Sequence, residues 1–96
     1  MIRLETPDHA GSRDQAKALA AALPADLEGE TVVLDCSELV VGAPSFLDEI
    51  VKEVLVLRRA GALEVSEAPD RARELLERAA QNRSVGERLH VAARTG

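Results

Sequence analysis

Apolar residues recur along the chain at two spacings, and the shorter spacing marks the predicted strands. Residues 2–5 alternate apolar and charged side chains, the two-residue period of a strand with one buried face. The run 31–36, Thr-Val-Val-Leu-Asp-Cys, shows no such alternation and predicts a strand buried on both faces. Residues 62–66 and 88–92 predict two further short strands, the last of them at an edge of the sheet.

Three other segments repeat apolar residues at steps of three and four, which predicts amphipathic helices. The first begins after Ser12, a favourable N-cap residue, and ends at Pro24. The second begins at Ser45, whose hydroxyl could accept a hydrogen bond from a first-turn amide, and Gly61 supplies its left-handed stop. The third occupies residues 69–81.

Strands and helices therefore alternate from one end of the chain to the other. This order predicts a single α/β domain over residues 1–96, with a small, mostly parallel sheet covered by helices. In such sheets the working surface lies beyond the carboxyl ends of the strands. The polar residues and thiol expected there are Asp35, Cys36, Ser37, Ser45, Ser66 and Glu67.

The composition narrows the classes of function. The chain has 17 acidic and 12 basic side chains, a formal charge of −5, and one Phe but neither Trp nor Tyr. Without a basic surface or aromatic platforms we expect no nucleic-acid partner, and the acidic balance favours a partner with a basic face. The single cysteine excludes an intrachain disulfide and a multi-cysteine metal site. The sequence also has no phosphate-binding glycine loop and no metalloprotease helix motif, and we expect no metal and no cofactor.

We expect neither a secretory signal nor a membrane span from the sequence pattern. Residues 1–6, Met-Ile-Arg-Leu-Glu-Thr, lack the apolar stretch of a secretory signal. The longest apolar runs, such as residues 18–24, fall far short of the ~20 residues that cross a bilayer. We therefore expect a cytoplasmic protein that has no membrane partner.

Ser45 is the leading candidate functional residue. As a helix cap it would contribute roughly 1 kcal/mol to stability. A hydroxyl at a helix N-terminus is also suited to accept a phosphoryl group, because the unpaired amides and the helix dipole favour an anion there. Phosphorylation would add about −1.5 to −2 charge beside Asp48 and Glu49 and change what docks at this position.

Two residues could instead act as nucleophiles, namely Ser45 and Cys36. The sequence neighbours of Cys36 are acidic and disfavour a thiolate, so a small buried packing residue is the simpler interpretation. His9 and His90 lie near opposite ends of the chain, which leaves Ser45 without an evident general base. These observations favour a protein that is not an enzyme.

Three segments resemble the STAS fold, the domain shared by sulphate transporters and bacterial anti-sigma factor antagonists. They are Val-Val-Leu-Asp at 32–35, Leu-Val-Val at 39–41 and Pro-Ser-Phe-Leu-Asp-Glu-Ile at 44–50. The order of the later elements also agrees, so the resemblance spans nearly the whole chain. Where the antagonists typically carry Asp-Ser-Ser/Thr-Gly, this chain has Ala43-Pro44-Ser45-Phe46.

The resemblance implies a non-enzymatic signalling domain in bacterial regulation. Its implied partner is a protein, often a GHKL-type ATPase anti-sigma factor, which would bind around the Ser45 helix and release the domain when that serine is phosphorylated. A phosphate in an interface that carries acidic residues would add repulsion and desolvation cost. The candidate partner-binding residues are Asp35, Ser37, Phe46, Asp48 and Glu49.

Two alternatives remain open at this stage. One is a sensor domain that binds a small anion or a nucleotide at the strand ends and the helix N-terminus. The other is a small enzyme that uses Cys36 or Ser45 as its nucleophile.

Overall fold

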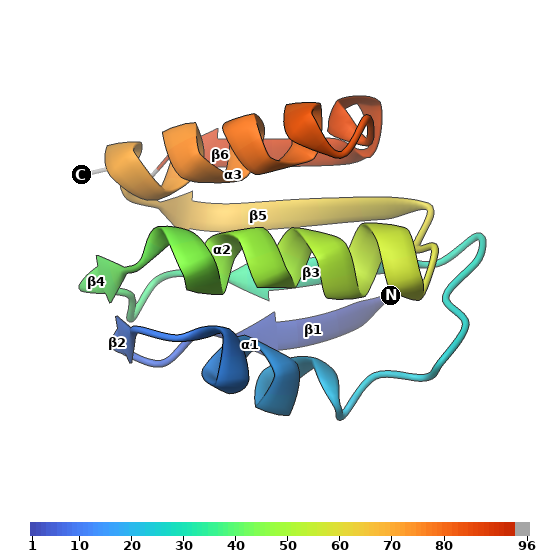
Figure 1. Ribbon diagram of the computed structural model, residues 1–96, viewed down its shortest axis with the longest axis horizontal. Coiled ribbons are helices and arrows are strands. Elements are labelled where there is room, and N and C mark those ends of the chain that lie inside the picture. The colour runs from blue at the N-terminus through green and yellow to red at the C-terminus, as the bar shows by residue number, and fades with distance from the viewer. Residues whose placement is uncertain (94–96) are drawn as a thin grey trace.

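The computed structural model describes residues 1–93, and its strands and helices alternate as the sequence pattern predicts (Figure 1). The strands are β1 (Ile2–Glu5), β2 (His9–Ala10), β3 (Thr31–Asp35), β4 (Val41–Gly42), β5 (Ala62–Ala68) and β6 (Leu89–Ala93). The helices are α1 (Arg13–Ala20), α2 (Pro44–Val51) with its π-helical continuation η1 (Lys52–Leu57), α3 (Asp70–Asn82) and the 3-10 turn η2 (Gly86–Arg88). The predicted α/β class and mostly parallel sheet are confirmed.

The main sheet has the strand order β1-β3-β5-β6, and every neighbouring pair in it is parallel. A second, very small sheet pairs β2 with β4. The strands follow one another across the sheet in the same order as in the sequence. Because crossovers between parallel strands are right-handed, this order places all the connecting helices on one face of the sheet. Figure 1 shows this arrangement, with α1, α2 and α3 lying side by side in front of the sheet.

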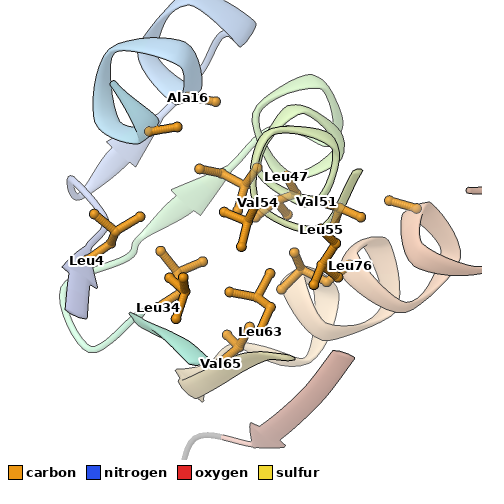
Figure 2. Close-up of a cluster of buried hydrophobic side chains, with 14 of the residues drawn as sticks. Leu4, Ala16, Leu34, Leu47, Val51, Val54, Leu55, Leu63, Val65 and Leu76 are labelled. Carbon is orange, nitrogen blue, oxygen red and sulfur yellow. The ribbon is translucent and has the colours of Figure 1, made fainter. Parts of the chain in front are cut away.

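The core fills the space between the sheet and the helix layer (Figure 2). Alternate residues of β3 and β5 point toward the helices, and they meet the apolar faces of α2, η1 and α3. The labelled members of this cluster from these elements are Leu34, Leu63, Val65, Leu47, Val51, Val54, Leu55 and Leu76. The helix layer and one face of the sheet therefore share a single core.

The second face of the sheet is open, which corrects the prediction that residues 31–36 form a strand buried on both faces. Val33 is only half-buried, whereas its neighbours Val32 and Leu34 are fully buried. Glu64 and His90, which are register partners on β5 and β6, are exposed. A shallow hollow of about 270 Å³ lies on this face. The prediction was wrong because β-branched residues are common in strands whether one face or both faces are buried.

Two helix ends and the last strand differ from the predictions. Ser12 caps α1 as expected, and Gln15 completes a reciprocal capping box with it, but α1 ends at Ala20, before Pro24. The left-handed residue that follows η1 is Arg59, with φ of 57°, and not Gly61. The last strand, predicted over residues 88–92, is β6 (Leu89–Ala93), and residues 94–96 lie outside the described part of the chain.

The start of α2 also differs from its prediction, and this difference bears on the site. Ala43 is the N-cap, Pro44 is the first helical residue, and no side-chain cap hydrogen bond is formed there. Proline is favoured at the first helical position because its φ is already helical and it has no N–H to leave unpaired. Ser45 therefore lies one residue inside the helix, and its assignment as the N-cap is wrong.

Candidate functional site: the Ser45 groove

Ser45 lies in a groove of about 470 Å³ on the outer surface of the helix layer, which we call the Ser45 groove. α2 and α3 pack against each other there, and the start of α1 contributes from the other side of α2. The residues that line the groove are Arg13, Pro44, Ser45, Asp48, Arg71, Leu75, Arg78, Ala79 and Asn82. Three separate segments of the chain thus build one concave surface around the predicted phosphoacceptor.

The hydroxyl of Ser45 is placed by the first turn of α2. The residue is half-buried, and no side-chain cap hydrogen bond is formed at the start of α2 among the residues that the structure describes. The N-terminus of an α-helix carries a partial positive charge, so an anion near Ser45 would be favoured. The hydroxyl is therefore neither sealed in the core nor committed to capping.

Asp48, one turn further along α2, is held between two arginines from neighbouring helices, an arrangement we call the Asp48 clamp. Nη1 of Arg13 lies 2.9 Å from Oδ2 of Asp48. Arg83, just after α3, donates from Nε to Oδ1 at 3.1 Å and from Nη2 to Oδ2 at 2.8 Å. The hydrogen bond from Arg83, with a further one from Arg13, lowers the pKa of Asp48 despite its partial burial. Asp48 therefore ties α1 and α3 to α2.

The groove also holds two arginines that its own carboxylate does not neutralise. Arg71 is exposed and pairs only at 3.7 Å with Glu74 on its own helix. Arg78 is exposed and makes no ion pair with a residue in the described range. Arg13 is the third arginine of the groove, and it is already paired with Asp48 and Glu49. Arg71 and Arg78 therefore give the groove a local positive charge in a chain of net charge −5.

These arginines were not predicted as site residues, although the sequence carries a signal for them. Residues 71, 75, 78 and 82 follow one another at steps of four, three and four, so they share one face of α3. The prediction of this helix rested on its apolar face alone, which does not include the arginines. Arg13 and Asp48 are 35 residues apart in the chain, and no local pattern links them.

Two of the predicted partner-binding residues, Phe46 and Glu49, are buried, and this corrects their assignment to a partner surface. Phe46 has 0% exposure and belongs to the hydrophobic core. Glu49 is 1% exposed, with Oε1 at 3.2 Å from Nη1 of Arg13 and Oε2 at 4.0 Å from Nζ of Lys52. Both side chains point inward because they lie on the face of α2 that packs against its neighbours, so neither offers surface to a partner.

Asp35 and Ser37 lie at the end of β3 and are not among the residues that line the Ser45 groove. The amide of Ser37 donates to Oδ1 of Asp35 at 2.9 Å, and Arg3 donates to Oδ2. The Ser37 amide is the main cause of the lowered pKa of Asp35. This pair closes the turn after β3 and stands apart from Ser45.

The structure places the other candidate groups away from the groove. Cys36 is fully buried at the end of β3, in agreement with its interpretation as a packing residue. His9 and His90 are both exposed, and neither lines the groove as described. Among residues 1–93 no group of three or more His, Cys, Asp or Glu side chains is arranged to hold a metal ion.

Over the described range, no helix combines the length and apolar character needed to span a bilayer. The chain was also compared with protein-family models, with curated proteins and with solved structures, and it matches none of them.

Proposed function

We propose that this chain is a non-enzymatic, cytoplasmic signalling domain of STAS type, which docks a partner protein at the Ser45 groove and is switched by phosphorylation of Ser45. The observation that carries the proposal is the setting of Ser45. A half-buried hydroxyl that is not used as a cap lies in a groove with three arginines. Arginines next to a serine favour the phosphorylated state, because they offer charge-assisted hydrogen bonds to its oxygens.

The mode of switching differs from the repulsion expected from the sequence. Asp35 is outside the groove, and Glu49 is buried against Arg13. A phosphate on Ser45 would therefore meet guanidinium groups more than carboxylates. In this proposal phosphorylation acts by occupying arginines that a partner would otherwise use.

The implied partner is a GHKL-type ATPase, on the basis of the resemblance in residues 32–50. The γ-phosphoryl group of ATP would be transferred to Oγ of Ser45, with the O–P bond to ADP broken and the hydroxyl proton released to solvent. The chain itself supplies the acceptor and the docking surface in this step. The catalytic groups belong to the partner.

The experiment incubates the protein with ATP, Mg²⁺ and a GHKL-type ATPase encoded beside its gene, and locates any added phosphate by mass spectrometry. We expect one phosphate on Ser45, none on Ser45→Ala, and loss of the complex after phosphorylation. Ser45→Ala is a clean control, because Ser45 caps nothing and the change should alter stability by less than about 0.5 kcal/mol. Equal ATPase binding by the unmodified and the phosphorylated protein would refute the proposal.

An enzymatic role is less well supported by the same geometry. Cys36 has no exposed surface to offer a substrate. Asp48 is the carboxylate in the groove, but its arginine partners lower its pKa and make it a weak base for activating Ser45.

A sensor for small anions or nucleotides is the second candidate function, and the three arginines of the groove favour it. A thermal-shift screen with phosphate, pyrophosphate and nucleotides separates it from the docking proposal. Stabilisation at millimolar ligand that is lost in Arg78→Ala would support the sensor.

A further inference from the structure

Two adjacent valines stand exposed at the carboxyl edge of the sheet. Val40 and Val41 are 69% and 51% exposed. Their amides both donate to the carbonyl oxygen of Asp8, at 2.8 and 3.0 Å, and Val41 pairs with His9 in the small β2-β4 sheet. The backbone is thus fixed by hydrogen bonds while the side chains stay in solvent. A rigid apolar surface of this kind gains free energy when a partner covers it.

This surface borders a hollow of about 190 Å³, which we call the valine hollow. Its lining residues are Leu39, Val40, Val41, Gly42, Pro69, Arg71 and Ala72. Arg71 also lines the Ser45 groove, so this one residue borders both the valine hollow and the groove. The two concave surfaces therefore adjoin, and a single extended segment could contact both.

Building on the proposed function, we propose that the docked part of the partner is an acidic segment containing an exposed aliphatic side chain. The aliphatic side chain would cover Val40 and Val41 in the valine hollow. The neighbouring carboxylates would pair with Arg71 and Arg78, which the protein's own acids leave largely unneutralised. This chemistry is opposite to the basic partner face expected from the net charge of −5, because Arg71 and Arg78 make this one surface locally positive.

The same arrangement explains how Ser45 could control docking. Ser45 and Arg78 line one groove, so a phosphate on Ser45 would compete with the partner's carboxylates for the same guanidinium groups. A phosphate carries more charge than a carboxylate and is attached to the groove, so its effective concentration there is high. Phosphorylation should therefore weaken binding of an acidic segment without distorting the fold.

The test uses the full-length ¹⁵N-labelled protein and the synthetic peptide acetyl-Glu-Asp-Leu-Glu-Asp-amide, followed by NMR at low salt. We expect amide shifts in residues 40–42 and 71–82, with a Kd on the order of 1 mM that rises with salt. A second peptide with Ser in place of Leu should bind about threefold more weakly to the wild type. Val40→Ser should weaken the Leu peptide by about the same factor and leave the Ser peptide unchanged.

Two charge variants form a matched pair. Arg78→Ala removes a groove arginine and should weaken the Leu peptide by about three- to fivefold. Lys17→Ala removes the same charge from an exposed position on α1, outside the Ser45 groove and the valine hollow, and should change the affinity for the Leu peptide by less than about twofold. Equal effects of the two variants would overturn the inference. Three NMR results would also overturn the inference. The first is no amide shift in residues 40–42 and 71–82 up to about 5 mM peptide. The others are amide shifts confined to the open face of the sheet, and amide shifts caused by pyrophosphate but not by the peptide.

A protein that carries phosphoserine at position 45 separates this inference from the proposed function. We expect it to bind the Leu peptide about tenfold more weakly than the unmodified protein. Equal binding would refute the Ser45 switch, while the docking chemistry would still be decided by Arg78→Ala and Val40→Ser. An effect of phosphoserine without any effect of those two variants would refute the docking chemistry and leave the switch standing.

Discussion

Replacing Asp48 by asparagine should destabilise the fold by breaking the Asp48 clamp. The substitution keeps the shape of the side chain and removes the charge that holds Arg83 and Arg13. Arg83 binds Asp48 through two hydrogen bonds, and the Asp48 and Arg83 side chains are only 25% and 29% exposed. Arg13 is half exposed, so solvent screens its contribution. The cost should therefore come mainly from the pair with Arg83.

The magnitude follows from the geometry of that pair. A hydrogen bond to a charged group contributes about 1.5–3 kcal/mol when fully protected from water, and partial exposure reduces this. We therefore expect Asp48→Asn to lower the free energy of unfolding by about 2 kcal/mol, which corresponds to a loss of about 10 °C in Tm for a domain of this size. The measurement is urea unfolding followed by far-UV circular dichroism, since the chain has no Trp or Tyr.

The effect should also depend on pH. Hydrogen bonding to Arg83 lowers the pKa of Asp48 in the folded state. The clamp therefore stabilises the protein fully above the unfolded pKa of about 4, and this stabilisation is lost as the pH falls through the lower folded value. The difference between wild type and Asp48→Asn should thus be largest near neutral pH and shrink in acid.

A control and a double-mutant cycle make this reasoning refutable. Glu28→Gln removes the same charge from a 76% exposed side chain and should change stability by less than about 0.5 kcal/mol. In a cycle of Asp48→Asn with Arg83→Gln, the second change should cost little once the first is present. A coupling energy under about 0.5 kcal/mol at pH 7 would show that the clamp does not stabilise the fold as argued.

Three further substitutions and one reaction probe other parts of the structure, and the same urea titration measures the substitutions. Ser12→Ala should cost about 1 kcal/mol, because the capping box with Gln15 is lost. Phe46→Ala should cost about 3–5 kcal/mol, since the ring is fully buried, and a negligible loss would contradict its place in the core. Arg59→Gly should raise stability by about 0.5 kcal/mol, because glycine adopts φ of 57° without strain and this gain exceeds the loss of the exposed ion pair with Asp26. The Cys36 thiol should react with a thiol reagent only after unfolding, and reaction in native buffer at the rate of free cysteine would contradict its burial.

Local patterns determined the order of the elements and several of their ends. The alternation in residues 2–5 and the three- and four-residue steps in α3 predicted the right secondary structure, because each segment buries one face. The N-cap at Ser12 was also predictable, since its capping box involves only residues three apart. The buried position of Cys36 followed from its place at the end of an apolar strand.

The tertiary structure decided which faces are covered and which side chains meet. The sheet is open on one side because its strands succeed one another in a single direction, and the residues of one strand do not determine that order. The Asp48 clamp joins residues 35 positions apart on either side, and the Ser45 groove collects arginines from two helices. The composition determined the net negative charge of the chain. The packing of α1, α2 and α3 decided that arginines from two helices line the Ser45 groove, because side chains distant in sequence become neighbours when their helices share one face of the sheet.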